Sequence, residues 1–257
     1  MKGKVALITG SATGLGKMTA MSLARQGCHI AINYVNSKDE AEALSREIEG
    51  FGVKSIAIKA DIASEPELYS LVDQTEERLG SVDILVNNAG PFIRERRLFS
   101  EYSRDEIVHM VNGNLTGVML LDHRVLPAMR EKKWGRIIHF GFGHAGEARA
   151  WPQRSAYAAA KVGLVSFTKT LAVEEGPYGI TVNMICPGDI RGANKEKTID
   201  EVSGIQDGLT PRGRSGSGED VARVIEYLCL DKSDFITGNI MDISGGLDPI
   251  RPLIKPE

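Results

Sequence analysis

The feature that most constrains the fold of this chain is an alternation of short apolar runs with longer amphipathic segments. Short continuous apolar runs are typical of strands buried on both faces, whereas apolar residues that recur at helical spacing are typical of surface helices. Strand, helix and strand, repeated in that order, predict a parallel sheet with right-handed crossovers and helices on both faces. We therefore expect an α/β, doubly wound fold with a seven-stranded parallel sheet.

The expected strands occupy residues 5–9, 29–34, 53–60, 84–87, 136–140, 181–186 and 238–243. The expected helices lie at residues 15–26, 39–50, 65–79, 103–130, 155–175 and 218–230. Four of these helices follow an S-x-x-[DE] pattern, which is typical of a capping box: Ser37 with Glu40, Ser64 with Glu67, Ser103 with Glu106, and Ser217 with Asp220. We expect a single domain over residues 1–257. The irregular stretch 188–218 is either a substrate lid or a surface insertion.

The composition is that of an ordinary globular protein, with 42% hydrophobic and 25% charged residues. A net charge of -3, without a block of like charges, disfavours a nucleic-acid groove or a membrane-surface helix. Met1 to Lys4 lead directly into a strand, so we expect no signal peptide and a cytoplasmic protein. The separated cysteines Cys28, Cys186 and Cys229 are expected to be buried and reduced, with no metal site.

Residues 5–16 read VALITGSATGLG, a strand pattern followed by a turn with three glycines and the start of a helix. Gly10 is expected to make the turn, Gly14 to let a ligand approach, and Gly16 to let the helix pack closely. Backbone N–H groups at the start of such a helix face an anion, which predicts a pyrophosphate site. An ordinary strand-to-helix turn explains this pattern alone equally well.

Two further patterns point to a ligand site: one follows the fourth predicted strand and the other lies on a predicted helix. Residues 87–90 read NNAG at the end of the fourth strand, where ligands of open α/β sheets bind. Tyr157 and Lys161 are four residues apart on a predicted helix, so their side chains share one face. A neighbouring ammonium favours phenolate, and Lys161 is therefore expected to lower the pKa of Tyr157. Taken alone, Y-x-x-x-K is also compatible with an unrelated tyrosine and lysine.

Together, these patterns resemble the short-chain dehydrogenase/reductase family, in particular its 3-oxoacyl-carrier-protein-reductase-like members. The ordered landmarks are TGSATGLG at 9–16, Asp61, NNAG at 87–90, Asn114, Y-x-x-x-K at 157–161, Asn183 and Pro187-Gly188. The likeness extends over nearly the whole chain. It implies a Rossmann-like sheet that binds NAD(P)(H), and an oxidoreductase that interconverts a carbonyl and a secondary alcohol.

The resemblance also implies residue roles. Tyr157 would be the proton donor and acceptor, Lys161 would hold the nicotinamide ribose, and Asn114 would hold a water linking this pair to solvent. Asp61 would meet the adenine, and Asn87 and Gly90 would border the adenosine. The cofactor-binding residues would be Gly10, Thr13, Gly14, Leu15, Gly16, Asn36, Ser37, Asp61, Ile62, Asn88, Ala89, Gly90, Tyr157, Lys161, Pro187, Gly188 and Ile190.

One departure from the family pattern concerns a serine that polarises the substrate carbonyl. Residues 136–146 read RIIHFGFGHAG, so the serine's position falls on Gly141, Phe142 or Gly143. Ser155 lies too near Tyr157 to replace it. Phe142 and His144 are the candidate substrate contacts, with an exposed loop histidine as the alternative for His144. The outcomes left open are a slower enzyme, a replacement donor, or a dinucleotide-binding regulatory protein with little or no turnover.

Three further expectations concern ligands and partners. The end of the second strand carries Asn36 and Ser37 in place of an acidic residue, which favours NADP(H) over NAD(H). Arginines 94, 96 and 97 could meet an anionic substrate, or could simply form a solvated charged loop. The resemblance implies a homotetramer or homodimer formed through the helices at 103–130 and 155–175 and through the last strand.

Overall fold

The predicted strands form one parallel sheet in the computed structural model, which describes residues 1–248. The strand order is β3-β2-β1-β4-β5-β6-β7, and every neighbouring pair is parallel. The predicted fold class is therefore confirmed. Residues 249–257 of the predicted domain lie outside the described residues. The strand bounds are β1 Val5–Ile8, β2 His29–Tyr34, β3 Ser55–Lys59, β4 Ile84–Asn87, β5 Gly135–Phe140, β6 Ile180–Pro187 and β7 Ile240–Ile243.

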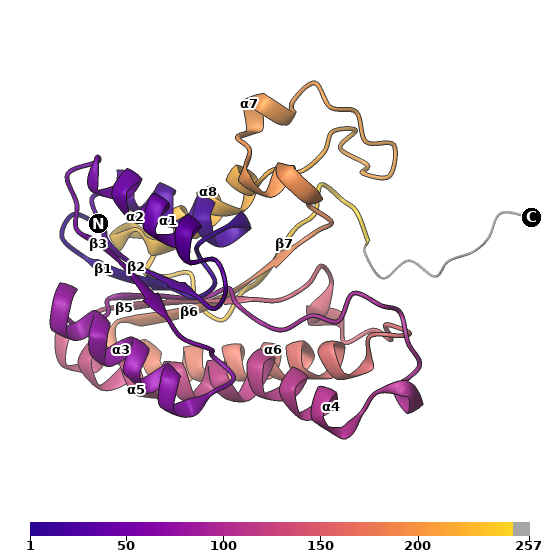
Figure 1. The fold of residues 1–257 in the computed structure, drawn as a ribbon, viewed down its shortest axis with the longest axis horizontal. Coiled ribbons are helices and arrows are strands. Elements are labelled where there is room, and N and C mark those ends of the chain that lie inside the picture. The colour runs from indigo at the N-terminus through magenta and orange to yellow at the C-terminus, as the bar shows by residue number, and fades with distance from the viewer. Residues whose placement is uncertain (249–257) are drawn as a thin grey trace, which may run out of the picture.

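Helices cover both faces of the sheet (Figure 1). On one face lie α1, α2 and α8, and on the other lie α3, α4, α5 and α6. Each face has its own apolar core, and the strands contribute to both. The helix bounds are α1 Gly14–Arg25, α2 Lys38–Glu49, α3 Glu65–Leu79, α4 Arg104–Val111, α5 Gly117–Lys132, α6 Ser155–Glu175, α7 Ile199–Val202 and α8 Gly218–Cys229.

The central strand β1 shows why continuous apolar runs predict this architecture. It pairs with β2 on one side and β4 on the other, and Ala6, Leu7 and Ile8 have no exposed surface. Their side chains point alternately to the two helical layers, so neither face of the strand tolerates polar residues.

The structure differs from the sequence-based expectation in the helix predicted at 103–130. This segment divides into α4 and α5 around a π-helical turn at Asn112–Thr116. Of the four expected capping boxes, those at Ser103 and Ser217 are formed. Those at Ser37 and Ser64 are not, and the Glu67 carboxylate instead accepts a hydrogen bond from the Asp61 N–H.

The strand order places the turn after β1 beside the turn after β4, at the carboxyl edge of the sheet. The chain winds outward from β1 to β3 in one direction and from β4 to β7 in the other, so β1 and β4 flank the topological switch point. Ligands of open α/β sheets bind beyond the strand ends at this point. The irregular segment 188–218, which includes α7, rises above the same edge (Figure 1).

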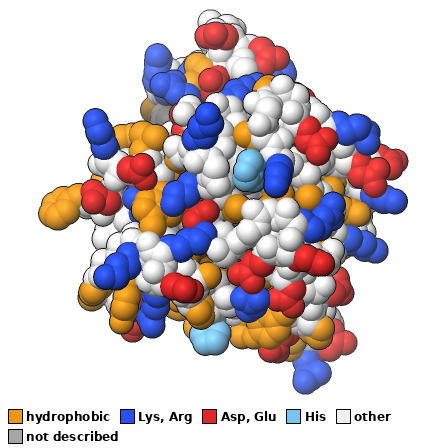
Figure 2. Space-filling view, turned by 90° about the vertical axis from the view of Figure 1, so that its left-hand side faces the viewer, with side chains coloured by type: hydrophobic (Ala, Val, Ile, Leu, Met, Phe, Trp, Pro, Cys, Tyr) orange, Lys and Arg blue, Asp and Glu red, His pale blue; other side chains and the backbone are white. Residues whose placement is uncertain are grey.

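The surface carries interspersed charges. Figure 2 shows acidic and basic side chains mixed over one face of the molecule, with apolar groups between them. No helix within residues 1–248 combines the length and apolar character needed to span a bilayer.

Candidate active site

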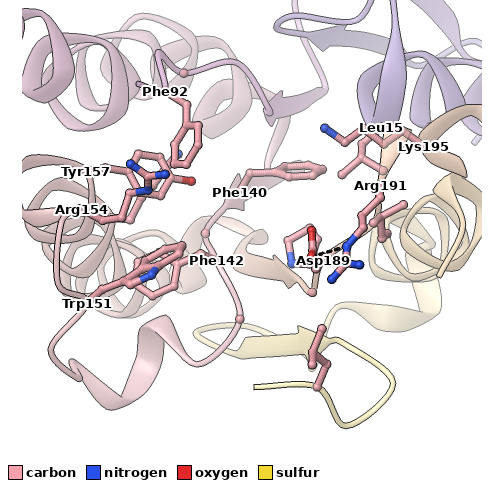
Figure 3. Close-up of a pocket in the computed structure, with 18 of the residues that line it drawn as sticks. Leu15, Phe92, Phe140, Phe142, Trp151, Arg154, Tyr157, Asp189, Arg191 and Lys195 are labelled. Atoms are coloured by element: carbon pink, nitrogen blue, oxygen red, sulfur yellow. Dashed lines mark hydrogen bonds and ion pairs between the residues drawn. The ribbon is translucent and has the colours of Figure 1, made fainter. Parts of the chain in front are cut away.

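A cavity of about 700 Å³ lies beyond the carboxyl ends of β1, β4, β5 and β6. This volume suits a small-molecule ligand. Figure 3 shows aromatic side chains and Arg154 around one end, charged side chains and Leu15 around the other, and Phe140 between them. The two ends come from different parts of the chain: the first from the β4–α4 loop, the β5–α6 loop and α6, and the second from the α1 turn and segment 188–218.

The turn after β1 already holds an anion. Gly10 and Gly14 have φ values of +60° and +64°, which glycine adopts without strain. The Gly14 N–H donates to a Glu196 carboxylate oxygen at 2.7 Å, and the Lys17 ammonium donates to the other oxygen at 2.9 Å. Burial opposes ionisation of Glu196, but these two donors outweigh it and lower its pKa. The start of α1 is therefore built to accept negative charge.

Gly16 is needed because α1 packs tightly onto its own turn. A Cβ at this position would lie 2.6 Å from the Gly10 carbonyl oxygen. The Asn88 amide donates to the carbonyls of Thr9 and Gly10 at 2.9 and 3.0 Å, which joins the β4 turn to the β1 turn. From β2, the Asn33 side chain accepts the Gly10 N–H at 3.0 Å.

Asn114 lies in the π-helical turn and faces Gly90. Its amide nitrogen donates to the carbonyls of Pro91 and Met110 at 2.8 and 3.0 Å. Its buried Oδ1 accepts no hydrogen bond within the described chain. A Cβ at Gly90 would lie 2.3 Å from this oxygen. An unpaired buried acceptor is costly, and it leaves Asn114 ready to accept from a water or ligand.

Tyr157 and Lys161 both line the cavity from α6, and the Tyr157 hydroxyl points into it (Figure 3). The Lys161 ammonium lies 6.0 Å from the centre of the tyrosine ring. Burial lowers the pKa of Lys161 from 10.5 to about 8 and raises the pKa of Tyr157. Lys161 was expected to lower the pKa of Tyr157, but in this chain on its own the pKa of Tyr157 is raised. Burial of the phenol has a larger effect on its pKa than the Lys161 ammonium 6.0 Å from the ring centre.

Phe142 is one of the three positions on which the missing serine could fall, and it lies beside Tyr157. Its ring lies 4.6 Å from Trp151 and 6.0 Å from Tyr157, centre to centre. Gly141 could not hold a side chain there, because its Cβ would lie 2.8 Å from the sulfur atoms of Cys186 and Met184. An aromatic ring therefore lies beside the tyrosine in the segment where the family pattern has a serine.

Comparison with known proteins places this geometry in a family. A family model described as enoyl-(acyl carrier protein) reductase matches residues 10–248. The solved structure of a mutant short-chain dehydrogenase/reductase from Serratia marcescens superimposes with a TM-score of 0.83 at 33% identity, covering 95% of this chain and 98% of that chain. The chain belongs to the short-chain dehydrogenase/reductase family. The resemblance expected from the sequence is thereby confirmed.

Other known proteins are similar to this chain over nearly its whole length. Bacillus subtilis YtkK, a protein assigned as an oxidoreductase, is 42% identical over 247 residues, which cover 96% of this chain and 97% of the relative. The 3-oxoacyl-[acyl-carrier-protein] reductase FabG of Staphylococcus epidermidis is 35% identical over 249 residues, covering 95% and 98%. A blue fluorescent protein from a metagenomic library, solved with NADPH, has a TM-score of 0.83 at 32% identity and the same coverage.

The predicted site residues of this short-chain dehydrogenase/reductase divide into two groups. Those that line the cavity are Leu15, Asn88, Gly90, Asn114, Phe142, Tyr157, Lys161, Pro187, Gly188 and Ile190. Those outside its lining are Gly10, Thr13, Gly14, Gly16, Asn36, Ser37, Asp61, Ile62, Ala89 and His144. Gly10, Gly14 and Gly16 still shape the turn beside the cavity.

Two predicted contacts are directed elsewhere. The His144 imidazole is hydrogen-bonded to Glu147 at 2.7 Å, and this bond raises the pKa of His144. Asn87, expected beside the adenosine, is buried and donates to Asp122 at 2.8 Å. Asp122 is also bonded at 2.7 Å to the buried His139. Within residues 1–248, no cluster of three or more histidine, cysteine or acidic side chains could hold a metal.

The cavity also contains residues that the sequence patterns did not identify. They include Phe92, Phe140, Trp151, Arg154 and Lys195. Phe92, Trp151 and Arg154 lie on loops or at a helix boundary, and Lys195 lies in a short 3-10 helix, where no spacing rule relates them to Tyr157. Arg94, Arg96 and Arg97 were named from the sequence as possible contacts of an anionic substrate, and of these three Arg96 lines the cavity.

The buried Lys161 ammonium has a predictable cost in stability. Replacement by Met removes a charge whose pKa is displaced from 10.5 to about 8, so the free energy of unfolding at pH 7 should rise by about 3 kcal/mol. Below pH 8 the wild-type penalty is complete, and it disappears as pH rises from about 8 to 10.5.

Urea unfolding of Lys161→Met and of the wild type at pH 7 and pH 10.5 measures this difference. Lys169→Met, which removes an exposed ammonium from the same helix, serves as the control. An equal stability of wild type and Lys161→Met at pH 7 would show that Lys161 is not desolvated.

Proposed function

We propose that this protein is an NADP(H)-dependent oxidoreductase that interconverts a carbonyl and a secondary alcohol, with Tyr157 as proton donor and acceptor. The observation that carries this proposal is the Tyr157 hydroxyl, which shares one cavity with Lys161 and with the anion-accepting end of α1. The FabG relative is named as a 3-oxoacyl reductase, which supports the same class of reaction. A nicotinamide bound here would supply or accept the hydride.

In the reduction direction, Tyr157 donates its proton to the oxygen of the carbonyl as hydride reaches the carbon. A tyrosine is already protonated near neutral pH, so the proton is available throughout the physiological range. Burial raises the pKa of Tyr157 and makes it a weaker acid, so proton donation depends on stabilisation of the phenolate by a nearby positive charge. That proton neutralises the negative charge that develops on the substrate oxygen, so the product is an alcohol and the negative charge is left on the Tyr157 phenolate.

Lys161 and Asn114 support the tyrosine from two sides. The Lys161 ammonium would stabilise a transient phenolate and bind the hydroxyls of a ribose, since it lies in the cavity without a carboxylate partner among the described residues. The free carbonyl oxygen of Asn114 would accept a hydrogen bond from a water that returns a proton to Tyr157.

The charges near the end of β2 favour NADP(H). Asn36, which is exposed, and Ser37 carry no negative charge that would repel a 2′-phosphate. Two lysines, Lys17 and Lys38, lie at the starts of the adjacent helices α1 and α2 and add positive charge nearby. An acidic residue at this strand end would instead bind the 2′-hydroxyl of NAD(H). The blue fluorescent relative solved with NADPH supports the same preference.

Phe142 also motivates a second function, that of a dinucleotide-binding regulatory protein with little turnover. A preorganised donor to the substrate oxygen is typically worth about 100- to 1,000-fold in rate, and Phe142 supplies none. The retained Tyr157, Lys161 and Asn114 favour the enzyme, because a binding protein needs no buried proton donor.

We further propose that the protein assembles as a homotetramer or homodimer. Exposed apolar side chains occur on the outer surfaces of the helices that the resemblance places at subunit interfaces, including Val108, Met119 and Val173. Such groups are covered when identical subunits pack around a two-fold axis.

Replacement of Tyr157 by Phe distinguishes the two functions. We expect NADPH oxidation with ketones and 3-oxoacyl thioesters to fall by about 100- to 10,000-fold, because the ring remains but the proton is lost. The dissociation constant of NADPH should change little. Absorbance at 340 nm and calorimetry provide the two measurements. A wild-type protein that binds NADPH but reduces no carbonyl and oxidises no alcohol would contradict the enzymatic proposal.

The missing serine can be restored at Phe142. Phe142→Ser should turn over a small aliphatic ketone about 100-fold faster than Phe142→Ala, because the two variants share the same truncation and differ in one hydroxyl donor. Steady-state kinetics at saturating NADPH give the ratio. Equal rates would show that another group already polarises the carbonyl. Gly141→Ser should be destabilised instead, since its side chain meets Cys186 and Met184.

Glu196 should weaken cofactor binding, because its carboxylate occupies the N–H of Gly14. We expect Glu196→Gln to bind NADPH on the order of tenfold more tightly, through loss of repulsion between like charges. Glu77→Gln, which makes the same charge change on α3, is the control. Unchanged or weaker binding by Glu196→Gln in calorimetry would show that the carboxylate does not compete with the phosphates.

A further inference from the structure

The reactive end of the cavity is enclosed by aromatic rings. Tyr157 has three aromatic neighbours, with ring centres 4.9 Å away for Phe92, 6.0 Å for Phe142 and 6.1 Å for Trp151. The rings come from the β4–α4 loop, the end of β5 and the β5–α6 loop, and they converge beside the tyrosine hydroxyl (Figure 3). Flat apolar walls of this kind favour a planar apolar group in the ligand, since aromatic pairs attract beyond simple burial.

The arginines around the cavity differ in their partners. Arg191 is paired with Asp189. On the aromatic side, Arg97 is paired with Glu106 at 2.6 Å and does not line the cavity. Arg96 and Arg154 do line it, and neither forms an ion pair with a carboxylate within residues 1–248.

Arg154 is the more informative of these two residues because only 8% of its surface is exposed. Its guanidinium lies 4.9 Å from the centre of the Phe92 ring. Its hydrogen bonds go to main-chain carbonyls, at 2.7 Å for Arg94 and Glu95 and 3.2 Å for Gln153. A guanidinium has five N–H donors, so two remain. A largely buried cation without a counter-ion is costly, and an anionic ligand group would compensate it.

These contacts join the cation to the reactive centre. The Phe92 ring touches both the Arg154 guanidinium and the Tyr157 ring, so one phenyl ring connects the positive charge to the proton donor. Arg96 adds a second charge at the exposed rim. The opposite end of the cavity has its own cations near Leu15, so these two arginines are not needed for the phosphates of a dinucleotide.

We propose that Arg96 and Arg154 select a carbonyl or alcohol substrate that joins an aromatic body to a carboxylate, with the aromatic body held against Phe92, Phe142 and Trp151. This inference rests on the proposed oxidoreductase function and specifies its substrate class. A flexible aliphatic acyl chain would use neither the flat walls nor the uncompensated charge.

The test compares acids with their neutral esters. Two aromatic probes, benzoylformate and 4-acetylbenzoate, are each paired with their methyl ester, and acetoacetate with methyl acetoacetate provides the aliphatic pair. NADPH oxidation gives kcat/KM for each compound. For at least one aromatic pair, the wild type should prefer the acid by about tenfold or more, mainly through KM, and high salt should reduce this preference. The aliphatic acid should be a poorer substrate than the aromatic acid.

Variants separate charge from loop anchoring. Arg96→Gln and Arg154→Met should bring the acid-to-ester ratio towards one. Arg154→Lys, which keeps the charge but loses the planar contacts to the loop carbonyls, should retain most of the ratio. Arg94→Gln removes a charge from the same loop outside the cavity lining and should leave the ratio unchanged.

The outcomes distinguish the two proposals. If esters are reduced as well as acids, or if aliphatic substrates are preferred, the substrate class is wrong while the oxidoreductase proposal stands. If no carbonyl is reduced although NADPH binds, the oxidoreductase proposal is wrong. Calorimetry of 4-acetylbenzoate and its methyl ester in the presence of NADP⁺ then decides the inference separately: tighter binding of the acid, lost in Arg96→Gln, supports an anion site, and equal or absent binding overturns it.

Discussion

The contact between the β1 turn and the β4 turn is the constraint on which the site depends. Asn88 donates to the carbonyls of Thr9 and Gly10, and Gly16 lets α1 approach the same atoms. These hydrogen bonds satisfy carbonyls that have left the sheet, and they fix where α1 begins. These bonds therefore fix the anion-accepting end of α1 relative to the β4 turn, from which the chain continues to Asn114. Without this contact, the pairing of β1 with β4 would still hold the strands together, but the turns beyond the strand ends would be free to move relative to each other.

Sequence patterns predicted the fold well because its determinants are local. Buried parallel strands need apolar runs and crossovers need helical periods, and both are visible over short windows. The helix at 103–130 was predicted unbroken because no residue type or spacing rule marks the extra residue of the π-helical turn at Asn112–Thr116. At Ser64 a longer-range bond from Asp61 to Glu67 replaced the expected cap, and the short pattern gave no sign of this competition.

The site was predictable where chemistry follows fixed spacing, and less so elsewhere. Tyr157 and Lys161 face the same cavity because four residues make about one helical turn. Trp151 and Arg154 reach it through the path of a loop, which depends on contacts with distant carbonyls. The pKa of Tyr157 was expected in the wrong direction, because sequence spacing shows a neighbouring charge but does not show how completely the phenol is removed from water.

The π-helical turn at Asn112–Thr116 links the site to the folding of the whole domain. One residue advances an α-helix by about 100°, so the additional residue in this turn sets the rotation of everything that follows. Leu121, Val125 and Met129 of α5 follow this turn and are buried in the core on one face of the sheet. A deletion that straightened the helix would turn these side chains towards water and would also withdraw Asn114 from Gly90. The same irregular turn thus serves both the burial of the α5 core and the position of a polar group in the cavity, so a change that removes it would affect stability and the site together.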